Sequence, residues 1–392
     1  MAREFVSSLN TTGDSIVSGP VLLESFIPGS ANLFPKMVTH INDAAWELWQ
    51  FDGLSADGKT AVTVSFYRDT RGLKEGGFHV ELNALWPDGS RWGEKLYFVE
   101  SIITAQGDSP HSGSMHGVWK SIGTTISSAA FTITSDLSKA MVHFSVPGRV
   151  VGTMELHALG GARESRLPAT EAAAQLGPCV YYLFPFGPAT VTADLALGLA
   201  DETNGTVQER KLLMRADENS RGGFVRGWSA FAWPRIMTDA YYLCGTAGPY
   251  MLQLIRIISS AADGRKPHVV ARLYRDDELV CAANQVAGVQ WPAEDGPTRK
   301  DTVVVEKVTN ESGCLAGAFR DKNTGYTIEF RHEGAHQQKQ WHFEVHHKRA
   351  WWSDYTSDQG TGKSGFIEAV IGGLDGELSF EGVGGAGQLQ LP

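Results

Sequence analysis

The sequence predicts an all-β protein with two domains, and three observations lead to that prediction. Short runs in which apolar and polar residues alternate recur along the whole chain, separated by Gly, Pro, Asn or Asp. The chain has 44 Gly and 16 Pro, which favours many turns over long helices. Its 392 residues exceed what one hydrophobic core usually supports. We therefore expect two β-rich halves, each a sandwich or a barrel of antiparallel strands.

The alternating runs predict most of the strands. They cover residues 61–67, 78–86, 95–102, 140–146 and 150–158 of the first half, and residues 267–274, 302–308, 326–331, 341–347 and 377–380 of the second. Pro87-Asp88-Gly89 predicts a hairpin turn. Residues 170–176, rich in Ala and Glu, predict a short helix. The polar stretch 215–223 is the best linker, so we expect domains 1–222 and 223–392.

Charge and composition limit the partners. A formal net charge of -10 and the lack of a Lys/Arg run argue against nucleic acid and an anionic membrane surface. The uncharged stretches 172–193 and 240–255 are broken by Gly-Pro steps, whereas a bilayer crossing needs about 20 continuous apolar residues. We expect buried strands there and no membrane span. The separated cysteines and the N-terminus without a signal-peptide pattern favour a cytoplasmic protein, and the oligomeric state is left open.

Two motifs are weighed and set aside. Residues 382–387 match the Gly-x-Gly-x-x-Gly string of dinucleotide folds, but no helix can follow before Pro392. His342, Glu344 and His346 share one face of a predicted strand and could supply metal ligands. We favour a solvent-facing polar row, because no signature fixes a further ligand. Neither a cofactor nor a metal is expected.

Aromatic segments with polar neighbours suggest a pocket for an apolar ligand. They are residues 46–51, 78–86, 228–233 and 341–345. In residues 78–86, Glu81 and Asn83 must project from the same face. If that face meets water, both are ordinary solvated side chains. If it lines a cavity, they are the polar groups that orient the ligand, and the residues alone leave both interpretations open.

Three strings carry a resemblance to a known family. They are WELWQFD at 46–52, ELNALWPDG at 81–89, and Trp228-Ser229-x-x-x-Trp233-Pro234. Together with Tyr241-Tyr242, residues 247–250, Trp341 and the Gly-rich tail around Val383, they resemble the fungal Diels-Alderase family of polyketide biosynthesis. The resemblance implies a β-sandwich-like N-terminal half, a lipocalin-like C-terminal β-barrel and a substrate pocket between them.

The resemblance also implies a reaction and its residues. The reaction is an intramolecular [4+2] cycloaddition of a linear polyene tetramic acid, supplied by a polyketide-peptide synthase, to a decalin. The implied catalytic residues are Asn83, Tyr67, Glu47 and Glu81. The implied substrate-binding residues are Tyr182, Trp228, Trp233, Ala247, Trp341 and Val383. A cycloaddition moves no obligatory proton, so proximity and hydrogen bonds to carbonyl oxygens suffice.

Three alternatives stay open on the same fold. One is a cytochalasan-type cyclase that forms an isoindolone. Another is a polyene hydratase, for which Asp239 or Glu47 would have to serve as the acid. The last is a non-catalytic carrier of hydrophobic metabolites.

Overall fold

The computed structural model describes residues 3–123, 126–159, 167–200, 207–284, 300–309, 323–333, 338–357 and 361–391. The chain forms two compact units. Unit 1 comprises Met1–Ser55, Lys59–Glu171 and Leu183–Ala232. Unit 2 comprises Ala56–Gly58, Ala172–Tyr182 and Trp233–Pro392. The domain division at residues 222 and 223 stays a prediction.

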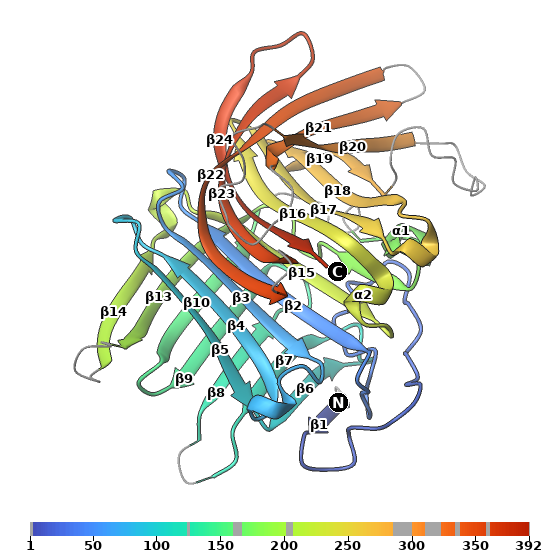
Figure 1. The fold of residues 1–392 in the computed structure, drawn as a ribbon, viewed down its shortest axis with the longest axis vertical. Coiled ribbons are helices and arrows are strands. Elements are labelled where there is room, and N and C mark those ends of the chain that lie inside the picture. Colours follow the sequence, from blue (N-terminus) through green and yellow to red (C-terminus); the bar gives the residue numbers. More distant parts are fainter. Residues whose placement is uncertain are drawn as a thin grey trace. The chain divides into compact units, whose positions relative to one another are not determined.

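Unit 1 is built from antiparallel strands (Figure 1). They are β1 (Arg3–Asn10), β2 (Trp46–Leu54), β3 (Ala61–Arg68), β4 (Phe78–Leu85), β5 (Arg91–Phe98), β6 (Glu100–Gly107), β7 (Ser114–Lys120), β8 (Ser128–Ile133), β9 (Lys139–Val146), β10 (Val150–Ala158), β13 (Ala189–Ala200), β14 (Val207–Met214) and β15 (Arg221–Ser229). They pair in the order β1-β6-β7-β8-β9-β10-β13-β15-β2-β3-β4-β5, with β14 on β13. A short turn of 3-10 helix, η1 (Leu73–Glu75), joins β3 to β4.

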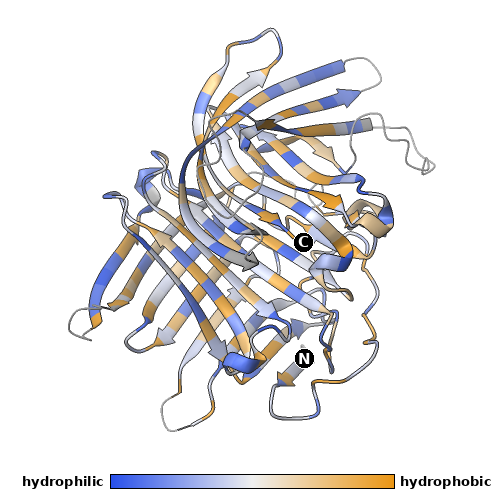
Figure 2. Cartoon of the chain, viewed as in Figure 1, coloured by the Kyte–Doolittle hydropathy of each residue, from blue (hydrophilic) through white to orange (hydrophobic). Residues whose placement is uncertain are grey.

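The sheet of unit 1 folds over into a sandwich, in which strands from its two halves pack face to face. Trp49 of β2 lies 5.8 Å from Trp119 of β7 between ring centroids, and Phe66 of β3 lies 5.2 Å from Phe131 of β8. Hydrophobic and hydrophilic residues alternate along many strands, as the colours in Figure 2 show. The apolar face of each strand therefore meets that of the opposite layer and leaves the core.

Unit 2 is a nearly closed barrel of nine strands. The strands are β16 (Met237–Ala247), β17 (Tyr250–Ser259), β18 (Pro267–Arg275), β19 (Glu278–Ala283), β20 (Lys300–Thr309), β21 (Asn323–Glu333), β22 (Gln338–Ser357), β23 (Thr361–Leu374) and β24 (Phe380–Gln390). Their order is β19-β18-β17-β16-β24-β23-β22-β21-β20, and the end strands β19 and β20 lie close together. Shorter elements are α1 (Glu171–Ala174), β11 (Gln175–Gly177), β12 (Val180–Leu183), η3 (Ala216–Glu218), α2 (Trp233–Ile236) and η4 (Ala261–Asp263).

The described inward-facing side chains of the barrel are a packed core with a polar network inside it. Apolar residues such as Leu243, Leu252 and Val370 are fully buried. Among them, the His347 imidazole lies 2.9 Å from both carboxylate oxygens of Glu368 and 3.1 Å from Asn323 Oδ1. Because these buried polar groups are partnered, they avoid the cost of unpaired burial.

The predicted all-β class is confirmed, with three local corrections. Residues 95–102 are two strands, because the chain leaves β5 near Val99 and enters β6, which lies between β1 and β7. Residues 377–380 are mostly a turn, in which Glu377 N–H donates to Leu374 O at 3.0 Å, and β24 begins only at Phe380. The predicted helix at 170–176 is reduced to α1. Within the described ranges, every helix is too short to cross a lipid bilayer.

Candidate active site

One face of β2, β3, β4 and β5 in unit 1 carries a continuous patch of hydrogen-bonding side chains, which we call the polar face. Its residues are Gln50, Asp52, Thr63, Ser65, Tyr67, His79, Glu81, Asn83 and Lys95. Strand register brings them together: Ser65 lies opposite both Gln50 and Glu81, and Thr63 lies opposite both Asp52 and Asn83. Since side chains alternate along a strand, the apolar residues between them point into the sandwich core.

Hydrogen bonds order one side of the polar face. The Thr63 hydroxyl donates to Asp52 Oδ1 at 2.7 Å, and Gln50 Nε2 lies 3.1 Å from both Asp52 carboxylate oxygens. Ser65 Oγ donates to Gln50 Oε1 at 3.4 Å. The Asp52 carboxylate thereby fixes the rotamers of its neighbours, which is what a preorganised binding surface requires.

Asn83 has a different environment. Its half-buried carboxamide makes no hydrogen bond within the described part of the chain. The residue opposite it on β5 is Gly93, where a Cβ atom would lie only 2.7 Å from Asn83 Oδ1. Gly93 therefore leaves the space that the Asn83 side chain occupies. A carboxamide of this kind has two N–H donors and an acceptor to offer to a ligand.

The environment of Tyr67 keeps its hydroxyl protonated, so that it can donate a hydrogen bond. Burial, followed by the negative charge of Glu81, raises the pKa of the Tyr67 hydroxyl well above its usual 10.0. The phenol is thus protonated across the physiological range and can donate to an oxygen atom. Tyr67, Glu81 and Asn83, which were predicted as catalytic residues, lie on this one face.

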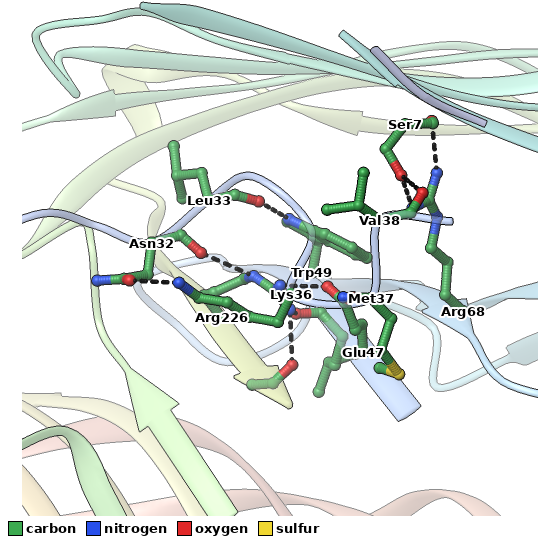
Figure 3. Close-up of polar contacts among 12 residues, drawn as sticks. Ser7, Asn32, Leu33, Lys36, Met37, Val38, Glu47, Trp49, Arg68 and Arg226 are labelled. Carbon is green, nitrogen blue, oxygen red and sulfur yellow. Dashed lines mark hydrogen bonds and ion pairs between the residues drawn. The ribbon is translucent and has the colours of Figure 1, made fainter. Parts of the chain in front are cut away.

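Glu47 lies on the opposite face of β2, among the core residues (Figure 3). Its carboxylate forms an ion pair with the Arg226 guanidinium and accepts a 2.7 Å hydrogen bond from the Met37 N–H. Both charged side chains are fully buried. The structure therefore does not bring Glu47 together with the other predicted catalytic residues.

The same buried cluster surrounds Trp228 on β15. The Arg226 guanidinium lies 5.1 Å from the Trp228 ring centroid and the Lys36 ammonium lies 5.5 Å from it. Lys36 Nζ also donates to Ser25 O at 2.6 Å and to Asn32 Oδ1 at 2.8 Å, and Figure 3 shows Lys36 between Asn32 and Glu47. Burial, followed by the nearby Arg226 charge, lowers the pKa of Lys36 to about 8.

The predicted substrate-binding residues of unit 2 differ in burial and in the face of the barrel wall from which they project. Tyr182 on β12 is buried, and Trp233 begins α2 and is half-buried. Trp341 and Ala247 belong to the core inside the barrel. Val383 lies on the outward face of β24, and at Gly58 a Cβ atom would approach Val383 Cγ1 to 3.2 Å. Ala247 and Val383 thus project from opposite faces of the barrel wall.

The remaining polar candidates are the possible metal ligands of β22 and the possible acid Asp239. His342, Glu344 and His346 form the predicted solvent-facing row, with side chains 40%, 53% and 44% exposed. No group of three His, Cys, Asp or Glu residues in the described ranges is arranged to hold a metal ion. Asp239, weighed for a hydratase, is paired with Arg256 at 2.6 Å and with Lys307.

Sequence reasoning missed six members of the polar face, namely Gln50, Asp52, Thr63, Ser65, His79 and Lys95. Strand alternation alone could have identified Gln50 and Asp52, because they occupy the face of β2 opposite Glu47. His79 lies on the same face of β4 as Glu81 and Asn83, because the three occupy alternate positions. What the sequence did not show was which face of β2 aligns with Tyr67.

Comparison with known proteins relates the whole chain to one family. Residues 1–392 match the family described as Diels-Alderase-like. The chain is 53% identical over 410 residues to "Diels-Alderase gNR600" of Fungal sp. (strain NRRL 50135), covering 100% of both. It is 45% identical over 393 residues to "Diels-Alderase phm7" of Pyrenochaetopsis sp., covering 98% of both. The crystal structure of CghA with Sch210972 matches with a TM-score of 0.87 at 33% identity, covering 99% of both chains.

The chain therefore belongs to the Diels-Alderase-like family. This confirms the family resemblance and the enzyme class, a Diels-Alderase that acts as a cyclase. It also agrees with the observed fold, a sandwich-like N-terminal half and a lipocalin-like barrel.

Proposed function

We propose that this Diels-Alderase catalyses the intramolecular [4+2] cycloaddition of a linear polyene joined to a tetramic acid, and that the product is a decalin. The observation that carries this proposal is the polar face of β2–β5, where the Asn83 carboxamide, which has no hydrogen-bond partner among the described residues, lies on the same face as Tyr67 and Glu81. Such a face offers donors without a catalytic triad, which suits a reaction with no obligatory proton transfer.

The donors act on the dienophile. Asn83 Nδ2 and the Tyr67 hydroxyl donate to carbonyl oxygens conjugated with it, which lowers the energy of the acceptor orbital and stabilises charge that grows in the transition state. A hydrogen bond with a net worth of about 1.4 kcal/mol corresponds to about a tenfold change in rate. Ionised Glu81 can only accept hydrogen bonds, so it is suited to the ring N–H of the tetramic acid.

Folding of the polyene contributes more to the rate than these hydrogen bonds do. Holding diene and dienophile in a near-attack shape removes much of the entropic cost of cyclisation. We propose Tyr182, Trp233 and Val383 for apolar contacts with the polyene, because Trp228 shares the core-facing side of its sheet with Glu47 and Trp341 is buried in the core of the barrel. Glu47 has no contact role in this proposal, because its carboxylate is paired with Arg226 on the opposite face of β2. A polyketide-peptide synthase is the proposed source of the polyene.

The test is a product analysis with purified protein. A synthetic linear polyenoyl tetramic acid is incubated with the enzyme, and products are followed by chiral chromatography with mass detection. The proposal predicts an isomer of unchanged mass and single stereochemistry, formed faster than in heat-denatured controls. A water adduct would instead indicate a hydratase, an isoindolone from a matched precursor a cytochalasan-type cyclase, and bound but unaltered polyene a carrier.

A further inference from the structure

His79 lies inside the polar face and packs against the ring of Tyr67. Its imidazole stacks on the Tyr67 ring with centroids 4.6 Å apart and an interplanar angle of 16°. The Arg71 guanidinium carbon lies 4.8 Å from the same Tyr67 ring centroid. The phenol ring therefore has a planar, polar partner in both His79 and Arg71, which restricts its rotation.

Each nitrogen of His79 lies within 4 Å of a carboxylate oxygen, and Nδ1 is buried without a hydrogen bond in the described part of the chain. Nδ1 lies 3.5 Å from Asp69 Oδ1, and Nε2 lies 3.6 Å from Glu81 Oε1. Asp69 is itself fixed by Arg71, whose Nε donates to Oδ2 at 2.6 Å. Lys95 Nζ lies 3.9 Å from the same Glu81 oxygen. Basic and acidic side chains thus alternate from the loop after β3 across β4 to β5, in the order Arg71, Asp69, His79, Glu81 and Lys95.

Burial distinguishes this series of side chains from an ordinary surface row. The side chains of His79, Asp69 and Glu81 are only 5%, 4% and 13% exposed. The comparable His342, Glu344 and His346 row of β22 is solvent-exposed and costs little to maintain. Burying ionisable groups is expensive unless they are well paired, so a buried row on a candidate active site is better explained by function than by stability.

We propose that His79 is a positioning residue for the cycloaddition. Its imidazole is stacked on the Tyr67 ring and fixes the direction of the Tyr67 hydroxyl, so that this donor meets the polar head of the substrate without rearranging. This rests on the proposed function, because Tyr67 and Glu81 contact substrate only if the polar face is the active site. Preorganised donors are effective because they need no reorientation during the reaction, and a displacement of about 1 Å can cost up to about 100-fold in rate.

A double-mutant cycle tests the proposal. The rates and product diastereomer ratios of Tyr67→Phe, His79→Ala and the double variant are compared with wild type. We expect His79→Ala to lower kcat about tenfold with little change in KM, and to shift the diastereomer ratio toward the uncatalysed mixture. Because His79 acts through Tyr67, the double variant should be no more than about threefold slower than Tyr67→Phe. His116→Ala on β7, an exposed histidine bonded to Thr132, is the matched control and should keep wild-type kinetics.

Two further variants distinguish loss of the ring stack from a general loss of folding. His79→Phe retains a flat ring against Tyr67 and loses both nitrogens, whereas His79→Gln retains a polar group and loses the stack. If the stack positions Tyr67, His79→Phe should restore most of the diastereomer selectivity and His79→Gln should not. Thermal unfolding of every variant is measured in parallel, so that a loss of kcat is compared only among folded proteins.

A spectroscopic measurement separates this inference from the proposed function. With 3-fluorotyrosine placed at position 67, the ¹⁹F spectrum reports ring reorientation in the absence of any polyene. Ring reorientation that is slow in the wild type and markedly faster in His79→Ala supports the inference even if the tested polyene is not turned over. Equal ring dynamics in the two proteins, or rate effects of His79→Ala and Tyr67→Phe that simply multiply, would overturn it.

Discussion

Glu47 and Arg226 form an ion pair in which both side chains are fully buried, and the Met37 N–H donates a 2.7 Å hydrogen bond to the same carboxylate. The pair joins β2 to β15 and to the segment that precedes β2. Arg226 also lies 4.1 Å from the Trp49 ring centroid and 5.1 Å from that of Trp228. Glu47 is thereby tied to the core of unit 1, on the face of β2 opposite Asp52 and Gln50.

Replacing Glu47 tests this structural role. Glu47→Gln removes the negative charge and leaves the buried Arg226 unpaired, which should lower the free energy of unfolding by about 3 kcal/mol. The measurement is the urea unfolding midpoint at constant slope. Glu155→Gln is the matched control, because Glu155 pairs with Lys139 at 2.8 Å on a partly exposed surface and should cost at most about 1 kcal/mol. Equal losses for the two variants would contradict the account.

Lys36 gives a pH dependence of stability with a definite sign. Burial lowers the pKa of Lys36 to about 8 in the folded protein, from 10.5 in the unfolded chain. Below pH 8 both states are protonated and the cost of burying the charge is fully present. Between about pH 8 and 10.5 the unfolded state binds more protons, so this group's contribution to stability rises with pH.

The test for Lys36 compares two proteins, because other lysines and tyrosines titrate in the same window. The difference in free energy of unfolding between wild type and Lys36→Met should move in favour of wild type as the pH rises from 8 to 10.5. A difference that stays constant over this window would mean that Lys36 has an ordinary pKa.

Ala247 and Val383 should respond oppositely to enlargement. Ala247 is fully buried inside the barrel, so Ala247→Leu should overpack the core and cost about 1–3 kcal/mol of stability. Val383 lies on the outward face, where the Thr246 hydroxyl donates to Val383 O at 3.4 Å. Val383→Leu should keep the thermal midpoint and shift the endo/exo product ratio. The control is Val151→Leu on the exposed face of β10, which should leave the ratio unchanged. An unchanged ratio for Val383→Leu would remove Val383 from the pocket.

Strand alternation made much of the fold predictable. Residues 150–158 and 140–146 were predicted within a residue of β10 and β9, because each strand alternates between core and surface. The break at Val99 was not predictable, because the chain changes layers there while its apolar pattern continues. Whether apolar residues fill a core or a ligand site depends on contacts between distant strands, which local patterns do not encode.

The candidate site was predictable only in part, for the same reason. Glu81 and Asn83 could be assigned to one face from alternation alone, and Tyr67 joins them through the pairing of β3 with β4. Glu47 was chosen from a motif whose register was unknown. Pairing of Leu48 with Tyr67 places Gln50 and Asp52, rather than Glu47, on the polar face. A one-residue difference along a strand reverses the face on which a side chain lies.

The most direct test of the central claim is the initial rate of cyclisation by Asn83→Ala compared with wild type. The half-buried carboxamide of Asn83 makes no hydrogen bond within the described part of the chain, so its removal should leave the thermal midpoint nearly unchanged. If the polar face of β2–β5 stabilises the transition state, kcat should fall about tenfold or more. A folded Asn83→Ala enzyme with wild-type rate and stereoselectivity would contradict the assignment of the active site to this face.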